Sequence, residues 1–385
     1  MIKLKEYDRP FGLYIHFPFC LRKCSYCDFY SIKYTQEFAN KYVESLLKEI
    51  KIYSKKIPTK KIKTIYLGGG TPGLFTYNQL YRIFDFIFNN FSVSEEGEIT
   101  LEANPGSLTL EKIKYFKKLG INRLSLGVQS FVEDELKLLG RFHSSKKARE
   151  VLLLINRVFD NYNTDLIFAI PGQSMDNWEY SLKQILELKP PHLSLYNLQL
   201  EKGTLLYKKV KKGEIKPVSD EVDARMYLKA KKQLGKAGYL HYEISNFARP
   251  GFESRHNILY WKYEPYLGLG PAAHSFTGKT RFNNYSNLTP YIKHLENGVL
   301  PVDNTVRLDR EEMMSEYIIL GLRLRKGISF KEFKECFGVD LKEIYYNKIT
   351  ELIEKDLIHI KGDRIQLTEK GLLLGNQVFV EFLPA

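Results

Sequence analysis

The stretch YIHFPFCLRKCSYCDFYS, residues 14–31, places three cysteines in a run of eight residues. Cys20, Cys24 and Cys27 follow a strand-like run and precede a long amphipathic pattern. We therefore expect them on a loop between a strand and a helix. The fourth cysteine of the chain, Cys336, is remote in the sequence, and four unevenly spaced cysteines do not make a disulfide framework.

Clustered thiols of this kind bind either zinc or an iron–sulfur cluster. A structural zinc ion closes four ligands, often from CxxC pairs. Here the local candidate for a fourth ligand is His16, which lies on the strand-like run and can point away from the thiols. The spacing CxxxCxxC therefore favours a [4Fe–4S] cluster with three protein ligands, in which one iron stays open to another molecule.

Six β-rich runs alternate with helix-like stretches in the first half of the chain. The runs cover residues 12–17, 63–69, 98–104, 122–129, 163–170 and 191–200. Between them, patterns such as residues 35–53 repeat apolar positions every three or four residues, as amphipathic helices do. Six βα units in series predict an α/β fold with a parallel sheet. We expect a partial (β/α)6 barrel, with a functional site at the carboxyl ends of the strands.

The chain divides into three predicted domains. Residues 1–205 form the barrel, and residues 206–304 form an α/β extension that contains a segment rich in aromatics, glycine and histidine. Residues 305–385 show helices followed by two short β runs around Gly362, an order that resembles a winged helix. The would-be recognition helix, residues 341–355, mixes glutamates with lysines, so we favour a structural or partner-docking module over DNA binding.

The composition argues against several classes of protein. Of the 385 residues, 44% are hydrophobic, and no apolar run reaches the roughly 18 residues that cross a bilayer. Charges and a proline stand in residues 1–12, where a signal peptide has its apolar stretch, so we expect a cytoplasmic protein. The net charge of +13 comes from dispersed lysines, which indicates no specific nucleic-acid site and suits an anionic small molecule. Peripheral contact with a membrane stays open.

The CxxxCxxC motif resembles the signature of the radical S-adenosylmethionine (SAM) superfamily. In that family the three cysteines hold a [4Fe–4S] cluster whose open iron binds SAM, and an electron cleaves SAM to a 5′-deoxyadenosyl radical. Tyr26, just before the last cysteine, also fits. The motif LGGGTP follows the second β-rich run, and the resemblance assigns its residues Gly69, Gly70 and Thr71 to SAM.

Further polar residues stand near the ends of successive β-rich runs. They are Glu102 in LEANPGS, Gln129 in GVQSF, Arg141 in LGRFH and Asp165 in NTDLIFAIPG. Any one alone is more often a surface or capping residue, but several converging at a barrel rim would form a binding site. The resemblance to the porphyrin-handling branch of the superfamily assigns these four residues to SAM, together with Tyr14, six residues before the first cysteine.

Residues 242–276, YEISNFARPGFESRHNILYWKYEPYLGLGPAAHSF, resemble the HemN/HemW group, and the likeness covers nearly the whole chain. This group contains oxygen-independent coproporphyrinogen III oxidases and their heme-chaperone relatives. The oxidases carry CxxxCxxCxC and a longer N-terminal segment, whereas this chain has Phe29 in place of the last cysteine. Both differences favour a heme chaperone. The resemblance implies heme as a ligand, heme-accepting proteins as partners, and an electron donor such as flavodoxin or ferredoxin.

His256, in HNILYW, matches the motif proposed to bind heme in this group. An imidazole is a normal axial ligand of heme iron, and Tyr260 and Trp261 suit the apolar face of a porphyrin. The alternative is that the motif holds the neighbouring LGLGPAAHS loop against the barrel. The resemblance favours heme, with His241 and His274 as runner-up ligands that we expect to be structural.

Three functions compete on this sequence. A heme chaperone leads, and an enzyme that decarboxylates the propionates of coproporphyrinogen III is the second. The third is a nucleic-acid-directed enzyme that uses the basic charge and the winged helix.

Ala272 stands at a position where many relatives have glycine. This difference bears on the conformation of the loop that contains Ala272, and it does not bear on the resemblance to the family.

Overall fold

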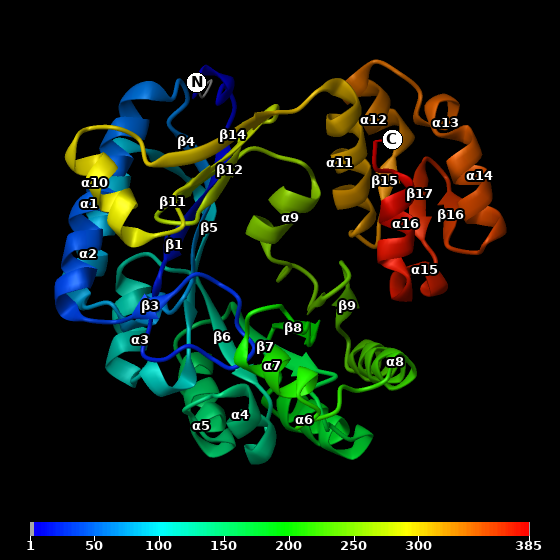
Figure 1. The fold of residues 1–385 in the computed structure, drawn as a ribbon, viewed down its shortest axis with the longest axis horizontal. Helices are drawn as coiled ribbons and strands as arrows, with labels where there is room; N and C mark the ends of the chain where they lie inside the picture. Colours follow the sequence, from blue (N-terminus) through cyan, green and yellow to red (C-terminus); the bar gives the residue numbers. More distant parts are fainter. Residues whose placement is uncertain (1–3, 385) are drawn as a thin grey trace.

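The computed structural model describes residues 4–384, and one large sheet dominates it (Figure 1). Within these residues the sheet has twelve strands in the order β14-β13-β12-β11-β1-β4-β5-β6-β7-β8-β10-β9. The seven consecutive strands from β11 to β8 are parallel. The six expected runs form β1 (Phe11–Phe17), β4 (Lys61–Gly69), β5 (Ser92–Ala103), β6 (Arg123–Gln129), β7 (Tyr162–Phe168) and β8 (His192–Asn197). The predicted α/β fold is confirmed, and in the described residues the barrel stays open because β14 and β9 do not pair.

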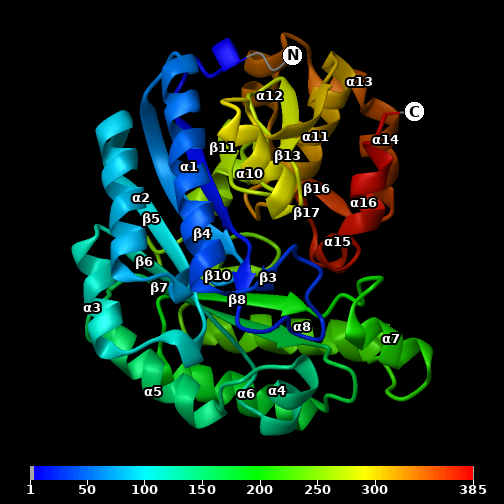
Figure 2. The same cartoon turned by 60° about the vertical axis from the view of Figure 1, so that its left-hand side comes forward.

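Helices cover the outer face of the parallel strands (Figure 2). They are α1 (Gln36–Lys56), α2 (Tyr77–Asn90), α3 (Leu110–Lys118), α5 (Ser145–Asn156), α6 (Met175–Leu188) and α8 (Asp220–Lys236). The shorter helices α4 (Glu133–Leu139) and α7 (Leu205–Lys211) instead form backbone hydrogen bonds with Ser25 of the cysteine loop. All seven residues of β6 are buried, as a central parallel strand requires. The start of α2 illustrates how the sequence positions a helix. Thr76 Oγ1 accepts a hydrogen bond from the N–H of Gln79, whose Oε1 accepts one from the N–H of Thr76.

The segment after β8 adds strands to both edges of the same sheet. β10 (Asn246–Ala248) pairs antiparallel with β8 and with β9 (Leu240–His241). At the other edge, β11 (Tyr266–Leu269) pairs parallel with β1. It is followed in antiparallel order by β12 (His274–Phe276), β13 (Thr280–Asn284) and β14 (Val302–Arg307). The predicted extension therefore shares the barrel's sheet, and the domain boundary at residue 205 stays a prediction.

Two helices of this segment lie on opposite sides of the sheet. α10 (Leu288–Glu296) packs against α1, while α9 (Arg255–Trp261) contacts β4 and α11 (Figure 1). Shorter elements are η1 (Leu4–Glu6), β2 (Phe19–Cys20), β3 (Ile32–Lys33), η2 (Pro72–Leu74) and η3 (Pro105–Ser107). In the part of the chain that the structure describes, no helix combines the length and apolar character needed to cross a membrane.

The C-terminal region has its own hydrophobic cluster, which includes Met314 and Phe382. Its elements are α11 (Arg310–Leu322), β15 (Ile328–Ser329), α12 (Phe330–Phe337), α13 (Leu341–Ile344), α14 (Tyr346–Glu354), β16 (Ile358–Lys361), β17 (Arg364–Leu367), α15 (Glu369–Leu373) and α16 (Gly375–Glu381). The expected β pair around Gly362 is confirmed as β16 and β17. The single helix expected over residues 341–355 is wrong, because Tyr345, with φ −109° and ψ 24°, separates α13 from α14. The outer limits of the predicted domains, residues 1 and 385, lie outside the described residues.

Candidate functional site

The carboxyl ends of the parallel strands open into a cavity of about 720 Å³ beside the cysteine loop. We call it the cluster cavity. Eleven of the residues predicted to bind the cluster or SAM line it: Cys20, Cys24, Tyr26, Cys27, Gly69, Gly70, Thr71, Glu102, Gln129, Arg141 and Asp165. They come from the loop after β1 and from β4 to β7, as a barrel rim predicts. Tyr14 and His256 are placed elsewhere.

The cysteine loop is hydrogen-bonded to the end of α4. The backbone N–H of Ser25 donates to the carbonyl of Leu139 at 3.0 Å, and its hydroxyl donates to the carbonyl of Leu138 at 2.5 Å. Gly140 ends α4 with φ +73°, and a Cβ there would approach the backbone nitrogen of Ser25 to 3.1 Å. The loop can therefore approach α4 closely because glycine follows the helix.

The three thiols are partly exposed, and polar groups approach two of them. Arg141 Nη1 donates to Cys24 Sγ at 3.5 Å, and Thr71 Oγ1 donates to Cys20 Sγ at 3.8 Å. Burial raises the pKa of Cys20 and raises the pKa of Cys27 to about 11. These two thiols are therefore protonated near neutral pH, and a cluster that binds their thiolates displaces the protons.

The donor set fits a cluster better than a zinc ion. Within residues 4–384, no three His, Cys, Asp or Glu side chains surround one point closely enough to hold a single metal ion. A [4Fe–4S] cluster binds each thiolate at a different iron, so its ligands do not need to meet at one centre. His16 does not complete a zinc site, because its Nδ1 lies 3.0 Å from the hydroxyl of Tyr14 and its Nε2 lies 3.2 Å from the carbonyl of Tyr30.

The glycine motif allows two chain segments to approach closely. A Cβ on Gly69, which has φ +98°, would lie 2.5 Å from the His16 ring, and a Cβ on Gly70 would lie 2.5 Å from the carbonyl oxygen of Phe19. The N–H of Gly70 donates to Phe17 O at 2.7 Å, and that of Thr71 donates to Phe19 O at 2.7 Å. These N–H groups are therefore used within the protein. An amino group of a ligand donates hydrogen bonds, so it would bind to carbonyl oxygens, which are acceptors, and not to these N–H groups.

Two carboxyl groups enter the cavity from β5 and β7, which lie on either side of β6 in the sheet. Burial raises the pKa of Glu102 to about 7, although the carboxylate accepts hydrogen bonds from Tyr66 Oη at 2.7 Å and from the Gly69 N–H at 3.1 Å. Burial also raises the pKa of Asp165, whose Oδ1 accepts a hydrogen bond from Asn163 Nδ2 at 2.6 Å. Both groups are poised to bind donor groups of a ligand.

Gln129 ends β6 with φ +73°, a left-handed conformation that is strained for a non-glycine residue. Its Oε1 is buried, and among the described residues it has no hydrogen-bond partner. A strained residue with an orphaned acceptor in a cavity is typical of a ligand-binding position.

Asn104 is a residue of the cavity that the sequence analysis missed. Its Oδ1 accepts a hydrogen bond from Arg141 Nη2, and its Nδ2 donates to Thr71 Oγ1 at 3.0 Å. It therefore links Thr71 to the arginine that approaches Cys24. The sequence feature that could have identified Asn104 is its position two residues after Glu102, just past the end of β5.

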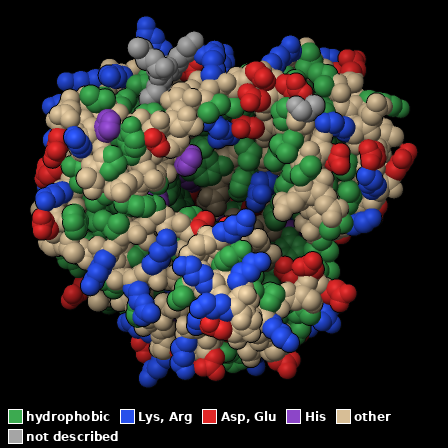
Figure 3. Space-filling model, viewed as in Figure 1, with side chains coloured by type: hydrophobic (Ala, Val, Ile, Leu, Met, Phe, Trp, Pro, Cys, Tyr) green, Lys and Arg blue, Asp and Glu red, His purple; other side chains and the backbone are tan. Residues whose placement is uncertain are grey.

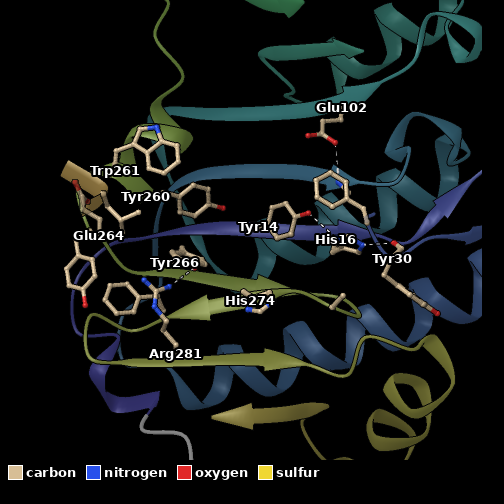
Figure 4. Close-up of a pocket in the computed structure, with 16 residues that line it drawn as sticks. Tyr14, His16, Tyr30, Glu102, Tyr260, Trp261, Glu264, Tyr266, His274 and Arg281 are labelled. Atoms are coloured by element: carbon tan, nitrogen blue, oxygen red, sulfur yellow. Dashed lines mark hydrogen bonds between the residues drawn. The ribbon is translucent and has the colours of Figure 1, made fainter. Parts of the chain in front are cut away.

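A second cavity of about 560 Å³ adjoins the first, and Phe29, Gly69 and Glu102 line both. We call it the aromatic cavity; its ring-bearing residues are Tyr14, His16, Phe29, Tyr30, Tyr260, Trp261, Tyr263, Tyr266, His274 and Phe276. Figure 4 shows the labelled side chains around it, brought together from β1, α9 and β11 to β13. Figure 3 shows a hollow on this face with hydrophobic side chains inside and both basic and acidic side chains around it. Tyr14, which was predicted to contact SAM, lies here.

His256 lines neither of these cavities. It is 1% exposed, its Nδ1 lies 2.7 Å from Thr64 Oγ1, and its Nε2 lies 2.8 Å from Tyr260 Oη. Burial lowers its pKa to about 3, so the ring is neutral. Both ring nitrogens have partners, so heme ligation by His256 stays a prediction that requires Thr64 or Tyr260 to move. Of the other residues in this motif, Asn257 lines the cluster cavity, whereas Tyr260 and Trp261 line the aromatic cavity.

His241, one of the two runner-up ligands, is packed in the fold. Its Nε2 lies 3.2 Å from both Tyr227 Oη and the carbonyl oxygen of Ile244, and its ring stacks on Phe247 with centroids 4.4 Å apart. It lines neither cavity. His274, the other runner-up, lies in the aromatic cavity.

The likeness to known proteins covers nearly the whole chain. The Radical SAM superfamily model matches residues 14–185, and the HemN C-terminal domain model matches residues 308–374. The chain is 37% identical over 380 residues to the "Heme chaperone HemW" of Lactococcus lactis, covering 98% of each chain. It is also 37% identical to the protein of the same name from Bacillus subtilis, covering 96% of this chain and 98% of that one. For the HemW of Escherichia coli the identity is 32%, with both chains covered fully.

Among solved structures, coproporphyrinogen III oxidase (HemN) from Escherichia coli, a radical SAM enzyme, superposes with a TM-score of 0.87. The two sequences are 23% identical, and the match covers 98% of this chain and 92% of that one. At this identity the likeness shows a shared fold. Together with the identity to the HemW proteins over nearly their full length, it establishes that the chain belongs to the radical SAM superfamily and, within it, to the HemN/HemW group.

Proposed function

We propose that this protein is a radical SAM heme chaperone, which holds a [4Fe–4S] cluster and SAM, binds heme and passes it to acceptor proteins. The observation that carries the proposal is the 37% identity to proteins named heme chaperone HemW over 98% of the chain. The two adjoining cavities support it, because one has the cysteines and polar groups expected for a cluster and SAM, and the other has aromatic walls. We place the protein in the cytoplasm.

In this proposal Cys20, Cys24 and Cys27 hold the cluster. The guanidinium of Arg141 donates a hydrogen bond to Cys24 Sγ and so orients this thiol toward the cavity wall. A cluster held by these three cysteines would supply the electron for the reductive cleavage of SAM, after receiving it from a donor such as flavodoxin or ferredoxin. We propose that Gly69, Gly70, Thr71, Glu102, Gln129, Arg141 and Asp165 bind SAM, with Tyr26 beside the cluster.

Two of these side chains have roles that follow from their chemistry. The deprotonated carboxylate of Glu102 accepts hydrogen bonds, and because burial raises its pKa to about 7 the group is only partly ionised near neutral pH. The orphaned Oε1 of Gln129 offers one more acceptor to a ligand. Tyr14 reaches SAM only from the side of the aromatic cavity.

Phe29 supports the chaperone over the oxidase. It stands two residues after Cys27, where the oxidases carry a cysteine, and 59% of its surface is exposed. It lines both cavities. An apolar ring between the two cavities offers a contact surface to a porphyrin, but it provides no thiol for chemistry.

The alternative function is an oxygen-independent coproporphyrinogen III oxidase, which would decarboxylate two propionates of its substrate to vinyl groups. The fold shared with HemN favours it. The C-terminal region, residues 305–385, is proposed to dock a partner protein rather than DNA.

Two assays on the anaerobically reconstituted full-length protein test the proposal. In the first, ferric heme is titrated into the protein, and we expect saturable binding with a protein-induced Soret band. In the second, the protein is incubated with SAM, reductant and coproporphyrinogen III, and we expect no protoporphyrinogen. Formation of that product over many turnovers would favour the oxidase. A wild-type protein that binds no heme would refute the chaperone.

A further inference from the structure

We propose that heme binds in the aromatic cavity with the imidazole of His274 as an axial ligand of the iron, and that His256 positions helix α9 without touching the iron. This inference rests on the proposed function, because it names the site at which a heme chaperone of this kind would hold its cargo. It reverses the order in which the sequence ranks the two histidines.

Hydrogen bonding separates His274 from most other histidines of the chain. Six of the eight have at least one ring nitrogen within hydrogen-bond distance of another group: His16, His143, His192, His241, His256 and His294. Within residues 4–384, no such partner is found for the rings of His274 and His359. His359 lies exposed on β16, in the C-terminal region. His274 therefore combines an unpartnered imidazole with a place in the aromatic cavity.

His274 opens β12, where it is exposed, while Ser275 and Phe276 after it are buried. In Figure 4 its ring lies among Tyr14, His16 and Tyr266, on the side of the sheet that faces the cavity. Burial and the nearby Arg281 lower its pKa, so the imidazole is neutral at physiological pH. A neutral imidazole is the form that binds a metal.

A buried carboxyl group holds the loop that precedes His274. Glu49, on α1, is 0% exposed and accepts hydrogen bonds from the Gly270 N–H at 2.9 Å, from Asn284 Nδ2 at 2.6 Å and from Tyr291 Oη at 2.6 Å. Asn284 Nδ2 also donates to the carbonyl of Gly270 at 2.9 Å. The loop before His274 is therefore tied to a helix and to β13, which fixes its backbone as a ligand position requires.

The walls of the cavity suit a flat apolar ring. Tyr260 and Trp261 come from α9, and Tyr266 and Phe276 come from β11 and β12. The volume of about 560 Å³ lies within the range of small-molecule and cofactor sites. The indole Nε1 of Trp261 is buried and has no acceptor among the described residues, so it is available to a polar group of the ligand.

The charged residues that line the cavity are Glu102, Glu264 and Arg281. The net charge of +13 of the chain favours the approach of an anionic porphyrin over longer distances. Arg281 is not one of the groups available to the propionates, because Glu316 accepts hydrogen bonds from its Nε at 2.9 Å and from its Nη2 at 2.7 Å. Its guanidinium instead stacks on Phe276, 4.7 Å from the ring centroid, and supports the wall.

His256 has a different position and a different set of contacts. The carboxylate of Glu98 accepts hydrogen bonds from the backbone N–H groups of Arg255 and His256, at 2.9 and 3.1 Å, and so stabilises the first turn of α9. The imidazole then joins Thr64 on β4 to Tyr260 on α9. His256 therefore fixes the helix that carries Tyr260 and Trp261 into the cavity.

The test is a titration of the full-length protein with ferric heme, followed by the Soret band. We expect His274→Ala to lose the histidine-ligated spectrum and to bind heme at least about tenfold more weakly, with the spectrum restored by added imidazole. His274→Cys should instead show the spectrum of thiolate-ligated heme. The exposed His359→Ala is the matched control and should match the wild type. Metal-free protoporphyrin IX should bind His274→Ala as it binds the wild type, because it has no iron to coordinate.

Each result decides the inference. If the wild type binds heme and both His274 variants keep its affinity and Soret band, the ligand assignment is overturned while the proposed function stands. If the wild type binds no heme, the proposed function itself fails. Thermal denaturation shows whether the His256→Ala variant is folded. If it is folded, we expect it to keep the histidine-ligated Soret band. Loss of that band in the folded variant would return the ligand role to His256.

Discussion

The two cavities are built in different ways, although they share a wall at Gly69 and Glu102. The cluster cavity takes its residues from a short loop and from the ends of strands that follow one another in the sequence. The aromatic cavity gathers residues from β1, α9 and the strands β11 to β13, which lie about 250 residues apart along the chain but side by side in the sheet. A site at the ends of successive strands can be recognised from motifs, whereas a site formed by distant edge strands depends on the sheet order.

The largest expected effect tests the cluster cavity. Cys24→Ala removes one of the three thiolate ligands that we propose, so the anaerobically reconstituted protein should lose nearly all its cluster. Iron and sulfide analysis, together with the visible absorption of the cluster, measures this loss. Cys336→Ala is the matched control, because this exposed cysteine lies on α12, far from the loop in sequence, and should leave the iron content unchanged. Full iron and sulfide in Cys24→Ala would contradict the ligand set.

The same contrast explains how much of the site could be predicted. Cys20, Glu102 and Gln129 were recognised because each stands near the end of a β-rich run, and parallel strands bring such ends to one rim. The motif puts His256 first among the candidate heme ligands, and this assignment stays a prediction, because a motif identifies the residue type but not its hydrogen-bond partners. The burial of His256 between Thr64 and Tyr260 depends on the packing of α9 on β4, which no local pattern encodes.

In the fold, the six parallel strands were predicted because long hydrophobic periodicity is a strong signal. The pairing of β11 with β1 was not predicted, because the partners of edge strands are set by tertiary packing. The break at Tyr345 between α13 and α14 was missed for a related reason: the sequence there has no proline or glycine, the usual markers of a helix end.

A smaller effect is expected at the aromatic cavity, where Glu49 holds the loop before His274. Burial raises the pKa of Glu49 from 4.5 to about 7. The folded state therefore holds this proton more tightly than the unfolded state does. The stability from this carboxyl is fully present below about pH 4.5 and is lost as the pH rises through about 7. With about 1.4 kcal/mol for each pKa unit, the loss is at most about 3 kcal/mol.

Glu49→Gln removes this titration. In urea unfolding between about pH 5 and pH 8, the wild type should lose up to about 3 kcal/mol of unfolding free energy relative to the variant. Tyr42, Tyr53 and Tyr291 nearby do not contribute, since burial raises each of their pKa values well above 10. Cluster content should not change, because Glu49 does not line the cluster cavity. If the unfolding free energies of the two proteins change with pH in the same way, the prediction is contradicted. Glu49 would then already be ionised in the folded state at low pH.

The smallest effect concerns the backbone of the same loop. Ala272 has φ +61°, a left-handed conformation in which a Cβ costs about 1 kcal/mol. Ala272→Gly relieves this strain but makes the unfolded chain more flexible, so we expect a net stabilisation between zero and about 1 kcal/mol in urea unfolding. The neighbouring Ala273 is the matched control, since it is 1% exposed and does not have positive φ. Ala273→Gly should therefore destabilise the protein by about 1 kcal/mol, because it removes a packed methyl group and adds backbone freedom. A clear loss of stability in Ala272→Gly would mean that its Cβ stabilises the loop despite the strained φ.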